Sequence, residues 1–161
     1  MKSNWYAVYT KPRWEKKVAF SMSVGGLENY CPLNKVVRKW SDRKKIVEEP
    51  LFTSYVFVRI TARQLSQIQQ IDGVVNFVYW LGKPAVIRDS EIELIKRFLN
   101  EHMNVKVERS NLQVNDKIKI LNGPFMEMEG NIVEVNKRIV KVNLASLRFT
   151  MSAEVQNVQL I

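Results

Sequence analysis

The stretch PLFTSYVFV, residues 50–58, decides how the fold is interpreted. Side chains alternate across a strand, so Tyr55 and Phe57 would share one face of a sheet. Val56 and Val58 would share the other face. Both faces are therefore apolar, which is typical of a central strand that is covered on both sides. An exposed aromatic face that awaits a partner is the alternative, and periodicity alone favours the covered strand.

The N-terminal stretch WYAVYT, residues 5–10, repeats this pattern and predicts another strand with two apolar faces. Trp14, Val18 and Met22 follow it at helical spacing. Gly25-Gly26 supplies a helix stop. We therefore expect an aromatic strand followed by an amphipathic helix.

Alternation and turn signals predict the other elements up to residue 103. They are an extended piece over 27–31, a hairpin of 36–40 and 45–47, a short helix over 61–71, a strand over 74–80 and a helix from Ile92 to near His102. Thr61 is a plausible N-cap of the short helix. This order predicts an α+β sandwich in which helices pack on an antiparallel sheet.

The last third of the chain differs in kind. Residues 104–112 are polar, lack a helical period and are expected to form a linker. Short alternating runs separated by turns then predict a small five-stranded β-barrel over residues 113–161. The runs are Ile118–Ile120, Ile132–Val135, Val140–Leu144, Leu147–Met151 and Val155–Val158. We expect two domains, residues 1–103 and 113–161.

The net charge of +9 is concentrated at one end of the 161 residues. The first 45 residues hold eleven basic and three acidic side chains, which is +8 of the total. Such an excess favours an anionic partner, although a charge run can also be only a solvated face. Trp14 and Trp40 lie among the basic clusters, as in surfaces that combine phosphate contacts with base stacking. The candidate nucleic-acid residues on this evidence are Arg13, Arg43, Lys44 and Lys45.

Several function classes are excluded by what the composition lacks. With one cysteine, Cys31, and one histidine, His102, the chain cannot form an internal disulfide and is short of metal ligands and of His-based catalysis. We expect His102 on a solvated helix end. Acidic residues such as Asp42 and Glu127 are better interpreted as loop or strand-edge charges than as catalytic pairs. We therefore expect no enzyme activity, no cofactor and no metal.

Targeting signals are also not visible. The N-terminus has only a few apolar residues before charge begins, whereas a signal peptide needs a longer apolar region. No apolar run approaches the roughly 20 residues of a membrane helix. A cytoplasmic location and no membrane partner are therefore expected.

The whole chain resembles the NusG family of transcription elongation factors, in which an N-terminal NGN domain precedes a C-terminal KOW domain. Residues 5–10 with the basic helix resemble the family's first strand and helix, and residues 50–58 its central strand. Residues 73–78 (GVVNFV) resemble the strand that closes the NGN sheet. VND at 114–116 through GPF at 123–125 and GNIV at 130–133 resembles the KOW motif, which implies an SH3-like barrel.

Other segments resemble the specialised UpxY-type antiterminators of capsular polysaccharide operons, relatives of RfaH. These segments are Pro32-Leu33, WSDRKK at 40–45 and WLGKPAVI at 80–87. The sequence departs from the common KOW pattern at Glu127, where a small residue is usual. That departure bears on whether the loop contacts the family's usual partners.

The resemblance implies a non-enzymatic factor that binds the clamp of RNA polymerase through a hydrophobic patch and suppresses pausing or termination. Carried over by position, the polymerase contacts would be Tyr9, Phe52, Tyr55, Phe57, Trp80 and Ile92, with Gln64, Ser66 and Gln67 touching the opposite side of the cleft. This reverses the preference stated above, because the aromatic face then becomes a binding surface.

The same resemblance assigns roles to the basic helix and to the C-terminal domain. Lys11, Trp14 and Lys17 would face the non-template DNA of the transcription bubble or nascent RNA, while Trp14 also fits a core position. Phe125, Met126 and Met128 would recruit a ribosomal protein or termination factor. An RNA-binding or ribosome-associated KOW protein is the alternative function, and the weak +2 charge of residues 104–161 counts against it.

Overall fold

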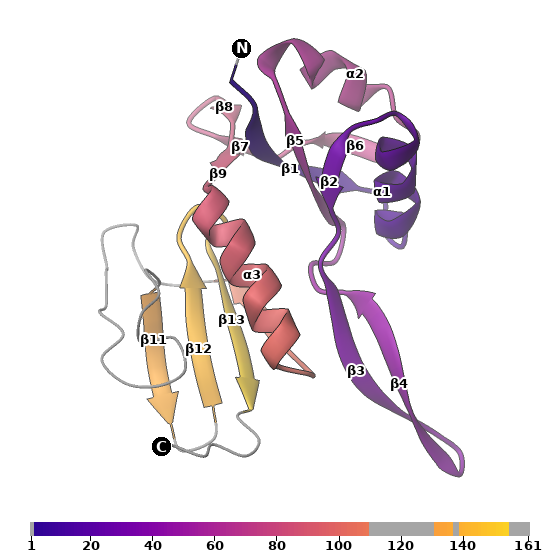
Figure 1. Ribbon diagram of the computed structural model, residues 1–161, viewed down its shortest axis with the longest axis vertical. Coiled ribbons are helices and arrows are strands. Elements are labelled where there is room, and N and C mark those ends of the chain that lie inside the picture. The colour runs from indigo at the N-terminus through magenta and orange to yellow at the C-terminus, as the bar shows by residue number, and fades with distance from the viewer. Residues whose placement is uncertain (1, 110–130, 137–138, 155–161) are drawn as a thin grey trace. The chain divides into compact units, whose positions relative to one another are not determined.

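The computed structural model describes residues 2–109, 131–136 and 139–154 (Figure 1). Backbone contacts divide the chain into two compact units. The first holds Met1–Pro32 and Pro50–Asp89, and the second holds Leu33–Glu49 and Ser90–Ile161. Each unit thus draws on two separate stretches of sequence. The division predicted at residues 103 and 113 remains a prediction.

The first unit is built on a five-stranded sheet whose pairings are all antiparallel. The path runs β2-β5-β1-β6, and β9 also pairs with β1. The strands are β1 (Asn4–Thr10), β2 (Glu28–Tyr30), β5 (Tyr55–Ile60), β6 (Val74–Phe77) and β9 (Val86–Ile87). Together with the helices below, this sheet confirms the α+β class expected for the N-terminal part of the chain.

The register of β1 and β5 confirms the predicted alternation. Val8 pairs with Val56 and Tyr9 with Tyr55, so aliphatic side chains lie opposite each other on one face and aromatic ones on the other. The same alternation places Phe57 opposite Ala7 on the aromatic face. Both faces of the strand pair are therefore apolar, and each carries a different set of side chains.

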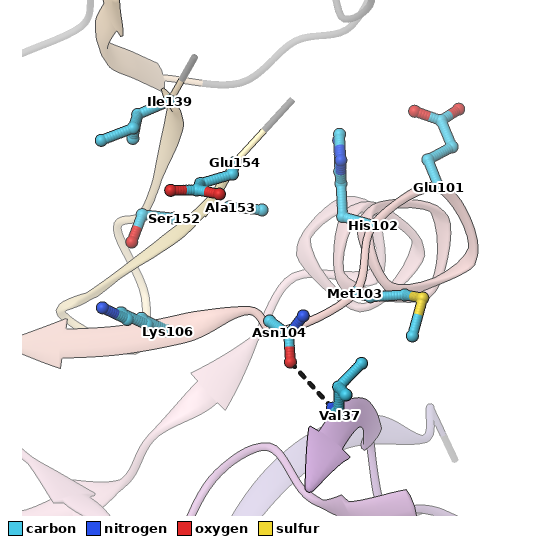
Figure 2. A pocket seen from close by; sticks show the side chains of 10 residues that line it. All are labelled: Val37, Glu101, His102, Met103, Asn104, Lys106, Ile139, Ser152, Ala153 and Glu154. Atoms are coloured by element: carbon cyan, nitrogen blue, oxygen red, sulfur yellow. Dashed lines mark hydrogen bonds between the residues drawn. The ribbon is translucent and has the colours of Figure 1, made fainter. Parts of the chain in front are cut away.

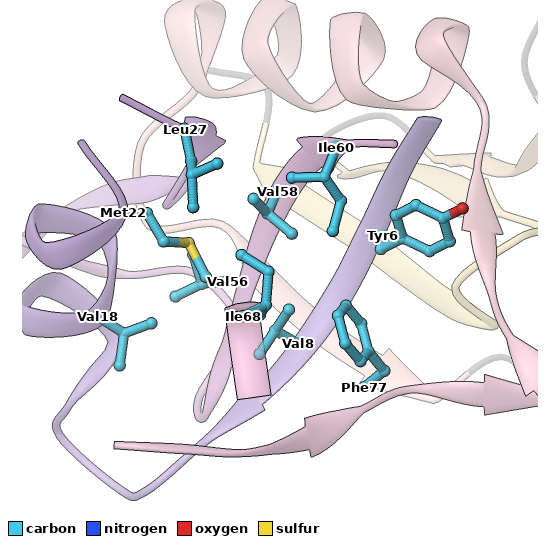
Figure 3. Packing of buried hydrophobic residues seen from close by; sticks show 10 residues of the cluster. All are labelled: Tyr6, Val8, Val18, Met22, Leu27, Val56, Val58, Ile60, Ile68 and Phe77. Carbon is cyan, nitrogen blue, oxygen red and sulfur yellow. The ribbon is translucent and has the colours of Figure 1, made fainter. Parts of the chain in front are cut away.

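Two helical segments close the aliphatic face. α1 (Glu15–Val24) directs Val18 and Met22 inward, and α2 (Leu65–Gln69) directs Ile68. The buried cluster comprises Tyr6, Val8, Val18, Met22, Leu27, Val56, Val58, Ile60, Ile68 and Phe77 (Figure 3). Burying one such side chain contributes about 1.5–3 kcal/mol, so this cluster is a main source of stability in the unit.

A 3₁₀ turn, η1 (Ala62–Gln64), leads into α2 and is held by a local bond. The backbone N–H of Thr61, the predicted N-cap, donates to Oε1 of Gln64 at 2.9 Å. Thr61 does occupy the N-cap position. The predicted helix over 61–71 is therefore a 3₁₀ turn followed by a short α-helix.

The predicted strand over residues 50–58 begins later than expected, at Tyr55. Residues 51–54 form a turn, in which Ser54 has a φ of 66°. The N–H of Thr10 donates to the Ser54 carbonyl at 2.9 Å, so the end of β1 holds this turn in place. Phe52 consequently lies outside the strand and does not follow its alternation.

The predicted strand over residues 74–80 is also interrupted. After β6 the chain forms a separate hairpin of β7 (Tyr79–Trp80) and β8 (Lys83–Pro84). The residues between them, Leu81 and Gly82, have φ values of 52° and 78°. Positive φ at both central positions is the geometry of a tight two-residue hairpin turn. The break itself falls at Val78, whose N–H donates to the Ala7 carbonyl at 2.9 Å and whose carbonyl accepts from the N–H of Ala85 at 2.8 Å.

The second unit begins with the basic hairpin, β3 (Leu33–Trp40) and β4 (Arg43–Pro50) (Figure 1). It confirms the predicted hairpin and is longer than expected. The unit also contains α3 (Asp89–Glu101), which agrees with the helix predicted from Ile92 to near His102. The buried side of α3 carries Ile95 and Phe98.

The C-terminal part of this unit is an antiparallel sheet of four strands in the order β10-β13-β12-β11. The strands are β10 (Lys106–Arg109), β11 (Asn131–Asn136), β12 (Ile139–Leu144) and β13 (Phe149–Glu154). Val142, Leu144 and Met151 are fully buried. Strand β10 lies in the segment that was expected to be a linker. The runs predicted at 118–120 and 155–158 lie outside the described residues.

Hydrogen bonds join the residues just before β10 to strand β3. The Asn34 side chain is buried and bonds both backbone groups of Val105, donating to its carbonyl at 2.8 Å and accepting from its N–H at 3.1 Å. Oδ1 of Asn104 accepts from the N–H of Val37 at 3.0 Å. These bonds satisfy backbone groups at the end of α3 and fix the direction in which β10 leaves it.

Candidate functional site

Aromatic side chains gather on the face of β1 and β5 that α1 and α2 do not cover. The rings of Tyr9 and Tyr55 lie 4.8 Å apart across the strands. Phe52 meets the edge of Tyr55 at 6.5 Å and of Phe57 at 5.6 Å. Tyr30 of β2 stacks on Phe57 at 6.4 Å. The structure thus brings together four of the predicted polymerase-contact residues in one cluster, which we call the aromatic cluster (Tyr9, Phe52, Tyr55 and Phe57).

Exposure divides the aromatic cluster into two parts. Phe52 and Phe57 are 3% and 0% exposed, whereas Tyr9 and Tyr55 are only partly buried. Aromatic pairs at these separations stabilise each other beyond the area that they bury. The tyrosines can therefore meet a partner directly, while the buried Phe52 packs against Tyr55 and Phe57.

The other predicted polymerase contacts lie on other elements. Trp80 is on the β7–β8 hairpin and is 43% exposed. Ile92 belongs to α3 in the second unit and is buried. Among the polar candidates, Ser66 and Gln67 are exposed, while Gln64 uses its Oε1 to accept the Thr61 bond described above.

The predicted nucleic-acid residues near α1 form a compact arrangement. The Lys17 ammonium lies 4.8 Å from the centre of the Trp14 ring, and the Lys11 ammonium lies 5.6 Å from it. Cation–π attraction at such distances holds two positive charges beside one indole. Trp14 is half-buried and also packs against the aliphatic core cluster. The two roles that the sequence left open for Trp14 are thus compatible.

Gly73 determines where the Trp14 ring can lie. A Cβ added to Gly73 would be 2.5 Å from Cε3 of Trp14 and 2.9 Å from Cγ2 of Val18. Gly73 also has a φ of 92°, a conformation that side-chain-bearing residues rarely adopt. Its carbonyl accepts from the N–H of Lys11 at 2.8 Å. The glycine therefore allows the close approach of indole and backbone that positions Lys11.

The remaining basic candidates are exposed. Arg13 precedes α1 with a φ of 69°. Arg43, Lys44 and Lys45 open β4 in the second unit, near the 60% exposed Trp40. Farther along the hairpin, the Arg38 guanidinium pairs with the Glu49 carboxylate. The hairpin tip thus carries positive charge beside an accessible indole, a combination that suits nucleic acid.

Sequence reasoning did not select Phe20, although it is 70% exposed on α1. Helical spacing by itself identifies the inward residues Val18 and Met22. The signal was present, because Phe20 falls between Val18 and Met22 in sequence and therefore points away from them. The predicted partner-binding residues Phe125, Met126 and Met128 lie outside the described residues.

A cavity of about 470 Å³ lies within the second unit, at the end of α3 (Figure 2). His102, Asn104 and Lys106 line it together with Glu154. His102 is half-buried against the Phe98 ring at 4.6 Å, and burial lowers its pKa. His102 thus lies at the end of α3 as expected, but its ring packs back on Phe98 and is only partly open to solvent.

Cys31 is a free thiol in the first unit, packed against the core cluster. Burial, followed by the nearby Glu15 carboxylate, raises its pKa to about 11. A thiol in that state is a poor nucleophile at neutral pH. Within the ranges that the structure describes, no three His, Cys, Asp or Glu side chains gather as a metal ion requires.

Comparisons with known proteins agree on one family. The family model described as transcription termination factor NusG matches residues 3–96. The chain is 27% identical to the transcription termination/antitermination protein NusG of Chlamydia trachomatis, over 78% of this chain and 75% of that protein. It is 26% identical to the protein of that name from Bacillus subtilis, over 82% of this chain and 81% of that one.

One further finding concerns a similar solved structure, and another concerns membrane-spanning helices. The chain is similar to a structure described as domain interaction in Thermotoga maritima NusG, with 24% identity, a TM-score of 0.48, and coverage of 97% of this chain and 99% of that one. No helix in the described part of the chain has both the length and the apolar character that a membrane crossing requires.

Proposed function

The chain belongs to the NusG family of transcription termination and antitermination factors, and from this premise we propose that it binds RNA polymerase through its aromatic cluster. Proteins of this family are transcription factors and not enzymes. In the proposed role the chain therefore acts by binding alone, without chemistry of its own.

The observation that carries the proposal is the pair of partly exposed tyrosines on the face of the sheet that α1 and α2 do not cover. Tyr9 and Tyr55 lie 4.8 Å apart, and the Tyr55 ring meets the buried Phe52, which in turn packs on Phe57. Tyrosine is enriched among residues that dominate binding energy, because its ring buries a large area and its hydroxyl can still bond. A rigid base beneath the pair lowers the entropy lost on binding.

The proposed mechanism depends on which two sides of the polymerase cleft the chain contacts. The tyrosines would contact the polymerase clamp, while Ser66 and Gln67 of α2 would meet the opposite side of the cleft. A factor that bridges the cleft binds the closed form more tightly than the open, paused form. Differential affinity of this kind shifts the population toward the elongating state.

The basic residues would then hold DNA at the same complex. Lys11 and Lys17, fixed beside Trp14, would contact phosphates of the non-template strand. Arg43, Lys44 and Lys45 of the hairpin in the second unit are separate candidates for nucleic-acid contact. Phosphate contacts add affinity that depends on salt. Nascent RNA is the other anionic partner at this position.

The remaining features concern the C-terminal domain and the target. We expect residues 113–161 to form the five-stranded KOW barrel, with Phe125, Met126 and Met128 recruiting a ribosomal protein or a termination factor. Likeness of WSDRKK at 40–45 and WLGKPAVI at 80–87 to UpxY-type and RfaH-type factors supports a specialised antiterminator. It would act in the cytoplasm at one operon, such as one for surface polysaccharide.

The test measures affinity for RNA polymerase from the organism that encodes the chain. Tyr9→Ala and Tyr55→Ala should each weaken binding by about 2 kcal/mol, the size expected for an aromatic anchor. In a reconstituted transcription assay, the same variants should lose the ability to shorten pauses.

Phe20→Ala is the matched control, since Phe20 is an exposed aromatic residue on α1, away from the aromatic cluster. It should retain polymerase binding. Unchanged binding in both tyrosine variants, with folding confirmed by circular dichroism, would contradict the proposed surface.

A further inference from the structure

The outer face of α1 carries an apolar stripe that the fold of the first unit does not require. Phe20 and Val24 are 70% and 72% exposed. They are four residues apart, so one lies above the other on the helix surface. Val18 and Met22 fill the core from the opposite side of the helix. Because the outer face of such a helix is ordinarily polar, two large apolar side chains on it indicate a contact with a partner.

The distribution of charge along α1 indicates the chemistry of that partner. Lys16 and Lys17 are exposed in the first turn, whereas residues 18–26 hold no charged side chain. The outer face is therefore cationic at one end, and neutral and apolar at the other. An acidic group fits the cationic end. The apolar end has no cation for the phosphates of a nucleic acid, but it suits the apolar side chains of a protein.

The spacing of Phe20 and Val24 favours a helix as the contact element of the partner. Side chains four residues apart form the ridges by which two helices pack against each other. An amphipathic helix presents its own apolar residues at the same spacing. A partner that adds a β-strand would instead need an open strand edge, which the surface of a helix does not offer.

The position of α1 leaves the aromatic cluster accessible to another partner. Figure 3 shows Met22 directed from α1 toward the strands, on their aliphatic face. The aromatic cluster lies on the other face of the same strands. A protein that covered Phe20 and Val24 would therefore not meet Tyr9 and Tyr55, and both surfaces could be occupied at once.

We propose that the outer face of α1 binds a second protein through an amphipathic helix that is apolar along one face and acidic at one end. The apolar residues of that helix pack on Phe20 and Val24, and its carboxylates lie beside Lys16 and Lys17. The chain thereby carries another protein to whatever its aromatic cluster binds. This surface goes beyond the proposed function, because it does not depend on the polymerase contact.

The experiment measures the affinity of the full chain for a fluorescent synthetic helix that has leucines along one face and glutamates in its first turn. A second probe has glutamines in place of the glutamates. The parent chain should bind the glutamate helix, and Phe20→Ala should weaken this binding about tenfold, as the truncation of an interface anchor does. The double substitution Lys16→Gln and Lys17→Gln should remove the preference for the glutamate helix over the glutamine helix.

Val86→Ala is the matched control, because Val86 is an apolar residue that is 49% exposed on β9, which lies apart from α1 (Figure 1). It should leave the affinity for both helices unchanged. Circular dichroism confirms that each variant is folded.

Three results would overturn the proposal. The parent chain might fail to bind the glutamate helix, or Phe20→Ala might bind it as tightly as the parent chain does. In the third result, Phe20→Ala keeps the helix but loses a labelled single-stranded DNA, and the face is then a nucleic-acid surface. Tyr55→Ala should lose RNA polymerase and keep the helix; if it kept both, the proposed function would fail while the surface on α1 stood.

Discussion

The two faces of the β1–β5 pair differ in chemistry more than in burial. The face under α1 and α2 presents Val8, Val56 and Val58, all 0% exposed. The opposite face presents aromatic rings, of which Phe57 is equally buried while Tyr9 and Tyr55 are partly open. Exposure by itself would therefore not separate a core from a binding surface in this sheet.

What separates them is the chemistry of the open positions. β-branched aliphatic residues pack densely and have no polar group to offer a partner. Tyrosine has an apolar ring with a polar end, and it suits a surface that is wet in one state and covered in another. The aliphatic face is best understood as permanent core, and the tyrosine pair as the part of the sheet that is available for binding.

The largest effect is expected on the aliphatic face. Phe77 is 2% exposed, and its ring meets Tyr6 edge to face at 5.9 Å. Phe77→Ala should lower the free energy of unfolding by about 3–5 kcal/mol, the usual cost of removing a buried phenyl ring. Chemical denaturation followed by circular dichroism measures this.

The partly open Tyr55 provides the comparison for that substitution. Tyr55→Ala should cost about 1–2 kcal/mol, because it loses its ring contacts with Tyr9 and Phe52 but little buried area. Equal losses in the two variants would show that the tyrosine pair is core as well, and the distinction between the two faces would be broken.

An intermediate effect is expected where α1 meets the turn before β6. Gly73→Ala should destabilise the chain by about 2 kcal/mol or more, because the new methyl group must push Trp14 or Val18 aside. It should also weaken nucleic-acid binding, since the Trp14 ring holds both Lys11 and Lys17.

Gly26→Ala is the matched control for this substitution. Gly26 has a φ of 75°, but nothing lies within 4 Å of the position that its Cβ would take. It should cost only the backbone strain, about 1 kcal/mol. If Gly73→Ala were no worse than Gly26→Ala, the close packing of Trp14 would not matter to stability.

The two faces also show how much of the fold can be predicted from the sequence. Alternation in residues 55–58 predicted two apolar faces, because it depends only on strand geometry. Alternation could not predict which face the helices cover, since that depends on the directions in which α1 and α2 return to the sheet. Alternation also placed Phe52 on a strand. In the structure Ser54 has a positive φ, and the strand begins only at Tyr55.

The candidate sites were predictable to different degrees for similar reasons. Trp14 and Lys17 come together because they are three residues apart at the start of α1. Lys11 precedes the helix and is placed by the turn at Arg13 and by its bond to the Gly73 carbonyl. Phe20 was missed because a search for inward apolar residues ignores an apolar residue on the outside. The closeness of Gly73 to Trp14 joins segments about sixty residues apart, and a single sequence carries no signal of such a contact.

The smallest effect on stability is expected from Cys31, which borders the aliphatic face. In the folded chain its pKa is about 11, against an ordinary value of 9.0, so the fold favours the neutral thiol. Stability from this group is complete below pH 9.0 and is lost as the pH rises through about 11, because only the unfolded chain ionises readily in between. The loss should be absent in Cys31→Ala. Subtracting the pH profile of this variant from that of the parent chain removes the contribution of lysine and tyrosine titration.

At pH 8, Cys31 should also react with iodoacetamide far more slowly than a cysteine placed at Tyr55 in the Cys31→Ala background, because a thiolate is the reacting species. Similar rates at the two positions would mean that the aliphatic face opens as readily as the aromatic one, and that it is not permanent core.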